Sequence, residues 1–312
     1  MLAEPPRTTA PRVSPAVPAP PRSGGLMVYA ALVSVLFAKP LLDLARFAWG
    51  SELFSHILLV PFVSFYLWRL DPPFAGPRPG RWTWPALGWI GLGAGLAAYA
   101  WWGLRTATEP NDRLAASTAA YLCVLFGGAW RWLGPAQLRR AIIPLGFLAF
   151  MLPWPEAMVD AVETGLQYAS AEVANVFLLL TGTPFVRDGL SFQLPGISLK
   201  VAQECSGVHS SYVLFMTAFV AGRLFLQSGT RRWVLALAVI PLGVLRNGFR
   251  ILVISMLCVH VSPDMIDSPI HHRGGPVFFL ISLVPFFLLL AWLRQRDRRA
   301  LAGAGAPGAR ND

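Results

Sequence analysis

The sequence predicts an all-α fold, a polytopic bundle of about eight transmembrane helices with a small extracytoplasmic helix and β-hairpin segment. Of the 312 residues, 55% are hydrophobic and only 13% are charged, whereas ordinary soluble domains carry about 25% charged residues. Several nearly uncharged runs also approach the roughly 20 residues that cross a bilayer as a helix. These runs lack the alternation of a membrane β-barrel, so the chain is expected to be an integral membrane protein of helices.

The chain begins and ends with polar tails around the apolar runs. Residues 1–25 are rich in proline and alanine and predict a disordered cytoplasmic tail, because this composition cannot bury a core. The first five spans are expected to occupy 26–155, a three-span core 205–293, and a basic cytoplasmic tail 294–312. The predicted spans are 26–47, 53–70, 84–103, 114–133, 141–155, 206–226, 233–258 and 276–293.

Residues 156–204 separate the fifth and sixth spans and differ from both. They hold an amphipathic stretch, "EAMVDAVETGLQYASAEVANVFLLL", followed by "TGTPFVRDGLSFQLPGISLKV". In the second stretch, turn pairs such as Asp188-Gly189 and Pro195-Gly196 surround short alternating runs, which indicates a small β-hairpin. The segment has too many acidic residues to cross a membrane easily.

The basic residues predict the orientation. With eight spans both termini lie on one side, and the chain segments on that side hold 17 of the 26 basic residues but 4 of the 16 acidic ones. By the positive-inside rule this side is cytoplasmic, in the inner membrane, so 156–204 and Cys205 face outward. The net charge of +10 therefore reflects topology, and no basic block with interleaved aromatics suggests nucleic acid.

Three chemically useful groups reach one depth near the outer surface in this topology. Cys205 begins the sixth span, Arg250 lies about two-thirds of the way along the seventh, and His271 and His272 open the eighth. A helix N-terminus lowers the pKa of a thiol, an intramembrane arginine can stabilise a thiolate or an oxyanion, and histidine transfers protons. Together they predict a cysteine acyl-transfer site.

Other roles for the same residues stay open. Cys123 and Cys258 are expected to be packing residues, and Cys205 alone could be one as well. Arg246 and Arg250, four residues apart, could reach lipid headgroups or form a salt bridge to Glu204. The His pair could lie at the interface or bind a metal with His260 and Cys258, although we expect neither a metal nor a cofactor. His209 could replace His271 as the proton carrier, and His56 is a weaker functional candidate.

Three motifs resemble those of the exosortase/archaeosortase family. "ECSGVHS" is similar to its Cys-Ser-Gly-x-x-Ser motif, "RNGFR" to its Asn-x-x-Arg, and "HHRGGPVFF" to its third, histidine-containing motif. The segments "LPWP", "TPFVRDGLSFQLPGISLKVAQ" and "SHILLVPFVSFYLW" also resemble family features. The resemblance covers roughly residues 50–293, with the motifs in the expected order.

The resemblance implies a membrane-embedded cysteine transpeptidase or protease. Such enzymes recognise a C-terminal sorting signal, a short motif that is often Pro-Glu-Pro, then a membrane helix and a basic tail. They cleave exported proteins outside the membrane, and a lipid or glycan is thought to accept the product. The motifs assign the nucleophile to Cys205, the arginine to Arg250 and the histidine to His271. Supporting positions are Ser206, Gly207, Ser210, Asn247, His272, Arg246, Glu204 and His209.

Two other functions fit the sequence. A simple hydrolase would use the same residues with water as the acceptor. A transporter or lipid-handling protein would use the arginines and the His pair to line a path, but a path needs polar groups through the membrane midplane. The resemblance implies three kinds of partner: membrane-anchored protein substrates, a lipid or glycan acceptor, and membrane lipids. No nucleic-acid partner is expected.

Overall fold

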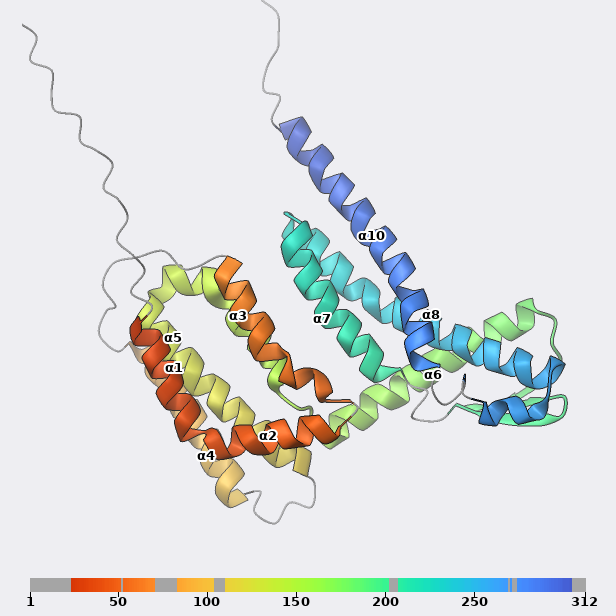
Figure 1. The fold of residues 1–312 in the computed structure, drawn as a ribbon, viewed down its shortest axis with the longest axis horizontal. Coiled ribbons are helices and arrows are strands. Elements are labelled where there is room, and N and C mark those ends of the chain that lie inside the picture. Colours follow the sequence, from red (N-terminus) through yellow and green to blue (C-terminus); the bar gives the residue numbers. More distant parts are fainter. Residues whose placement is uncertain are drawn as a thin grey trace, which may run out of the picture. The chain divides into compact units, whose positions relative to one another are not determined.

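The computed structural model describes residues 24–51, 53–70, 83–103, 110–201, 207–268, 270 and 274–304. It consists almost wholly of helices, with one small sheet (Figure 1), so the predicted all-α class is confirmed. The chain forms two compact units, the first made of Met1–Phe47 and Ile57–Pro153 and the second of Ala48–His56 and Trp154–Asp312.

Each of the eight predicted spans coincides with helix over most of its described length. Among the described residues, three helices are long and apolar enough to cross a membrane alone, or up to five if two bent pairs each count as one span. The three are α7 (Val208–Phe225), α8 (Gly229–His260) and the Gly275–Ala300 part of α10 (Gly275–Ala304). The chain is therefore a helical membrane protein.

Unit 1 begins with a bent pair where the sequence predicts one span. The helices α1 (Gly24–Leu36) and α2 (Ala38–Gly50) meet at 74°. Pro40 has no N–H to donate to Leu36, and its ring crowds that carbonyl, so a straight helix is disfavoured here. A 3₁₀ turn, η1 (Ser55–Leu58), precedes α3 (Val60–Leu70).

The rest of unit 1 packs around the long helix α5 (Pro110–Phe147), which is interrupted at Gly134 with φ 70°. Its partner α4 (Trp84–Ala98) runs into a π-helical turn, η2 (Tyr99–Gly103), and α5 continues into a 3₁₀ turn, η3 (Leu148–Met151). Glycines allow α4 and α5 to approach closely, because a Cβ at Gly93 would lie 2.9 Å from the Ala120 carbonyl oxygen.

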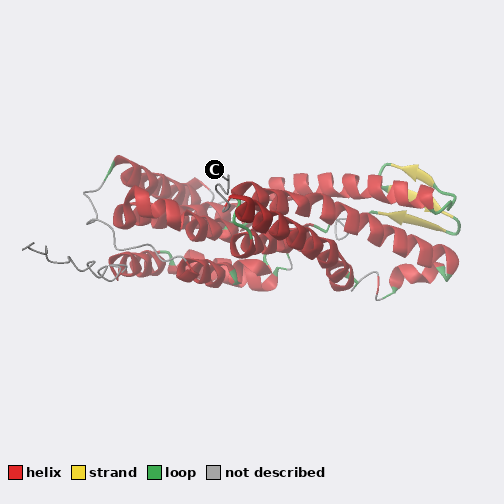
Figure 2. Cartoon of the chain, turned by 90° about the horizontal axis from the view of Figure 1, so that it is seen from above, coloured by secondary structure: helices red, strands yellow, loops and turns green. Residues whose placement is uncertain are grey.

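Unit 2 combines a helical part with a sheet. Its first helix, α6 (Glu156–Leu180), packs along α8, and α7 and α10 also pack against α8 (Figure 1). The sheet has three antiparallel strands in the order β1 (Val186–Asp188), β2 (Ser191–Leu194) and β3 (Ile197–Lys200), and a 3₁₀ turn, η5 (Pro263–Asp267), follows α8. The predicted hairpin is thus confirmed, with a third strand added (Figure 2).

Two apolar clusters hold unit 2 together. The first lies between α6, the sheet and α8, where Phe192 is fully buried beside Leu178 and Ile251. The second joins α7, α8 and α10 around Leu214, Leu235 and Phe286. Helices within a membrane associate chiefly through close van der Waals packing of such side chains. The sheet and the three-helix group are therefore both anchored on α8.

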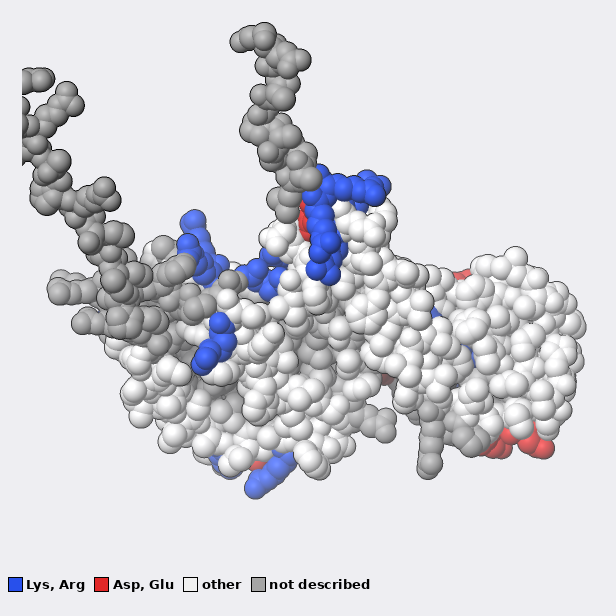
Figure 3. All heavy atoms as spheres, turned by 45° about the horizontal axis from the view of Figure 1, so that its top comes forward, with Lys and Arg blue, Asp and Glu red and all other residues white. Residues whose placement is uncertain are grey.

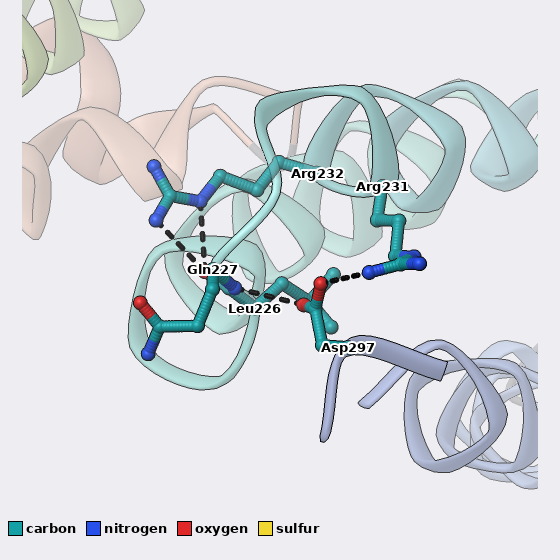
Figure 4. A network of polar contacts seen from close by, with 5 residues as sticks. All are labelled: Leu226, Gln227, Arg231, Arg232 and Asp297. Carbon is teal, nitrogen blue, oxygen red and sulfur yellow. Dashed lines mark hydrogen bonds and ion pairs between the residues drawn. The ribbon is translucent and has the colours of Figure 1, made fainter. Parts of the chain in front are cut away.

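A network of hydrogen bonds connects the turn between α7 and α8 to α10 (Figure 4). Asp297 of α10 is buried, with 4% of its surface exposed, and it accepts hydrogen bonds from the Gln227 amide at 2.8 Å and from the Arg231 guanidinium. Arg232 donates two hydrogen bonds to the Leu226 carbonyl, which caps the end of α7. The face drawn in Figure 3 is largely uncharged, with basic side chains gathered near the end of α10 and a few smaller charged groups elsewhere.

Candidate functional site

The candidate site lies around the start of α7. Gly207 precedes this helix with φ 69° and ψ 14°, a left-handed conformation that glycine adopts without the steric penalty of a Cβ. Its carbonyl oxygen accepts hydrogen bonds from the Ser211 amide at 3.0 Å, from Arg246 Nη2 at 3.1 Å and from Ser210 Oγ at 3.3 Å. The first turn of α7 is thereby fixed to α8.

The part of α8 that meets this turn is polar and buried. Arg246 is 8% exposed and Asn247 is 2% exposed. A Cβ at Gly207 would lie 3.8 Å from Asn247 Cγ, so the amide of Asn247 also faces the start of α7. Arg250 is half-buried and lies one helical turn further on, about 6 Å along the axis. We call residues 246–250 the α8 polar strip.

The start of α10 reaches the same strip. Phe278, which is 4% exposed, packs edge-on against Phe249 with ring centroids 6.3 Å apart. The Phe278 amide donates to the Gly274 carbonyl at 3.1 Å, which sets the first turn of the helix. A Cβ at Gly274 would overlap the Ile270 carbonyl, so the chain requires glycine at this close approach. Both α7 and α10 therefore begin beside α8 residues 246–249.

Several predicted site residues lie outside the described residues, namely Glu204, Cys205, Ser206, His271 and His272. Of the predicted residues that are described, Gly207 and Ser210 lie together with Arg246 and Asn247, and Arg250 continues the same helix. His209 is exposed and points to a different neighbour, the Leu53 carbonyl, with Nδ1 at 3.3 Å.

A second histidine, His56, belongs to this region more closely than its sequence suggests. His56 is 6% exposed, and its ring centroid lies 4.4 Å from that of Tyr212 on α7. Tyr212 in turn packs edge-on against Trp154, with ring centroids 5.5 Å apart. The His56 Nδ1 lies 3.0 Å from the Leu53 carbonyl, the same oxygen that His209 approaches. Because a carbonyl only accepts, the two contacts favour the Nδ1–H tautomers.

The short segment Ala48–His56 therefore packs with unit 2, although both its sequence neighbours belong to unit 1. Its contacts fall on the first two turns of α7, near Gly207. His209 and Leu53 are in contact although they are 156 residues apart in the sequence. The one sequence signal was that His56 stands in a segment, "SHILLVPFVSFYLW", that resembles the exosortase family.

The structure also shows where the two other cysteines lie and whether side chains that could bind a metal gather. Cys258 is 2% exposed in the interior of α8, and Cys123 is half-buried in α5; both are free thiols. Among the described residues, no three His, Cys, Asp or Glu side chains lie close enough to hold a metal ion. The metal-site alternative includes His271 and His272, which are outside the described residues.

The comparison with known protein families decides the class. The sequence model of a family described as transmembrane exosortase matches residues 49–288. The chain belongs to this family. The match confirms the resemblance predicted for roughly residues 50–293, and it makes this exosortase a membrane-embedded sorting transpeptidase or protease that acts on protein substrates. No curated protein and no solved structure matches the chain.

Proposed function

We propose that this exosortase is a cysteine peptidase or transpeptidase that cleaves the C-terminal sorting signals of exported proteins. The signal is of the Pro-Glu-Pro type, followed by a membrane helix and a basic tail. Cleavage takes place at the outer face of the inner membrane, with both termini of the enzyme in the cytoplasm. A lipid or glycan at the cell surface accepts the released carboxyl end.

The convergence of α7 and α10 on the α8 polar strip carries this proposal. Gly207 contacts Arg246, and Phe278 contacts Phe249. Cys205 precedes Gly207 by two residues and His271 precedes Gly274 by three, which are chain lengths of at most about 7 and 11 Å. These tethers support a site in which thiol, imidazole and the Arg250 guanidinium act on one substrate bond.

Cys205, Arg250 and His271 each have a separate part in the reaction. The Cys205 thiolate attacks the carbonyl carbon of the scissile peptide bond, and Arg250 stabilises the negative charge on the carbonyl oxygen. The C–N bond then breaks, His271 gives a proton to the departing amine, and the substrate remains as a thioester on Cys205. His271 next takes the proton of the acceptor hydroxyl or amine as that group attacks the thioester and frees the thiolate.

The supporting residues act on these three. Arg246 fixes the start of α7 through Gly207, and Ser210 and Asn247 stabilise the same turn. The backbone amides around Ser206 and Gly207 supply further donors to the oxyanion. Glu204 and His272 flank the reacting groups in sequence, and His209 is the alternative proton carrier.

Processing of a signal-bearing substrate tests the proposal. Replacing Cys205 by Ala or Ser should abolish processing, whereas Cys123→Ala and Cys258→Ala should leave it nearly unchanged. Arg250→Lys should impair it severely, because an ammonium cannot reproduce the planar guanidinium. Full processing by the Cys205→Ala variant in vivo would refute the mechanism.

A hydrolase with the same residues is the alternative within this class, because water could also attack the thioester. Mass spectrometry of the processed substrate separates the two functions. A C-terminal adduct indicates transfer, and a free carboxylate indicates hydrolysis.

A further inference from the structure

The outer edge of β3 is a row of backbone groups that pairs with no other strand among the described residues. In an antiparallel ladder, hydrogen-bonded residue pairs alternate with pairs that are not bonded. The Val201 amide donates to the Leu190 carbonyl at 2.9 Å, and the register places Lys200 opposite Ser191 and Ser198 opposite Gln193. The amides and carbonyls of Ser198 and Lys200 therefore point away from β2.

These backbone groups have no hydrogen-bond partner in the part of the chain that the structure describes. The strand pairs with β2 and with no other strand there. The side chains of Ser198 and Lys200 are exposed, whereas Leu199 between them is buried in the apolar cluster against α8. Among the described residues β3 thus pairs with β2 on one side and with no strand on the other, and an unpaired strand edge is the arrangement that accepts an added strand.

The edge leads directly to the proposed nucleophile. Cys205 follows Lys200 by five residues, a chain length of at most about 18 Å. Lys200 is one of two lysines in the protein, and no ion pair joins it to an acid among the described residues. An extended peptide with an acidic side chain would match both the backbone groups and this charge.

We propose that the sorting signal binds as an added strand along the outer edge of β3, with its acidic residue beside Lys200. This inference rests on the proposed function. Successive residues of a strand direct their backbone groups to opposite edges, so the two prolines of a Pro-Glu-Pro signal face away from β3 and lose no bond. The glutamate between them donates and accepts through its own backbone, and Lys200 neutralises its carboxylate.

Removing one amide hydrogen from the substrate tests the backbone pairing and leaves the enzyme unaltered. The full-length enzyme in lipid vesicles is given a synthetic substrate made of the Pro-Glu-Pro signal, a membrane helix and an arginine tail. N-methylation of the glutamate amide should lower kcat/KM roughly tenfold. N-methylation well upstream of the motif is the matched control and should have no effect.

The enzyme side of the edge is tested at Ser198. Ser198→Pro removes an outward amide and no bond to β2, so it should weaken processing as N-methylation does. For the charge, Lys200→Gln should lower kcat/KM several-fold with the Glu substrate and have no effect with a Gln substrate. Lys39→Gln, at an exposed lysine, is the control for Lys200→Gln and should not change kcat/KM with either substrate.

The results of these experiments distinguish a failure of strand addition from a failure of the proposed function on which it rests. A wild-type enzyme that leaves the unmodified substrate uncleaved overturns the proposed function. Cleavage that is insensitive to N-methylation and to Ser198→Pro overturns strand addition alone. Equal effects of Lys200→Gln on the Glu and Gln substrates overturn the pairing of Lys200 with the acidic residue.

Discussion

Nη2 of Arg246 donates a hydrogen bond of 3.1 Å to the carbonyl oxygen of Gly207, across 39 residues of sequence. The same nitrogen lies 3.5 Å from Ser211 Oγ. A buried cation on α8 thus holds the backbone two residues after the predicted nucleophile.

Arg246→Lys should lower processing by about tenfold or more, because hydrogen bonds to charged groups contribute about 1.5–3 kcal/mol and lysine cannot reach both partners with one planar group. The rate of substrate cleavage by purified enzyme measures the effect. Arg46→Lys, at a side chain that is 79% exposed, is the control. Equal activity of the two variants would contradict the positioning role of Arg246.

Gly207→Ala should destabilise the protein and reduce activity. A left-handed backbone costs a residue with a Cβ about 1–2 kcal/mol, and the added carbon would lie 2.6 Å from Arg246 Nη2. Thermal unfolding in detergent, followed by helical circular dichroism, measures the loss. Gly229→Ala at the start of α8 meets nothing within 4 Å and should leave the unfolding temperature nearly unchanged; a similar loss there would point to a nonspecific effect.

Gly248→Ala should separate α6 from α8. The new methyl group would overlap the Val173 side chain and lie 3.2 Å from the Ala174 amide nitrogen, and such overpacking costs about 1–3 kcal/mol. Because Gly248 lies within the α8 polar strip, activity should fall together with the unfolding temperature. Gly165→Ala on α6 has open space around it and should stabilise by up to about 1 kcal/mol. The idea of close α6–α8 packing fails if Gly248→Ala is as stable as the wild type.

Asp297→Asn should loosen the turn between α7 and α8 from α10. The substitution removes a buried negative charge that binds Arg231 and the Gln227 amide, at a cost of about 1.5–3 kcal/mol. Asp43→Asn breaks only an exposed pair with Arg46 at 3.7 Å and should cost about 0–1 kcal/mol. The difference in unfolding temperature between the two variants measures the contribution of the network.

The sequence motifs also pointed to residues of α8 that meet the start of α7. "RNGFR" supplied Arg246, Asn247 and Arg250, and the structure places the first two against Gly207. The positions of Cys205 and His271 stay predictions, since both lie outside the described residues. The role of His56 was only weakly indicated, because its contact with Tyr212 joins segments that are far apart in sequence.

By itself the sequence determined the helical membrane fold and the small hairpin, because hydropathy, turn residues and proline act over a few neighbouring residues. Only the tertiary structure decided that Gly207 meets Arg246, that Phe278 meets Phe249 and that Ala48–His56 packs with unit 2. These contacts depend on how separate helices pack, which is set by the complementary shapes of many side chains at once. No local pattern of residues contains that information.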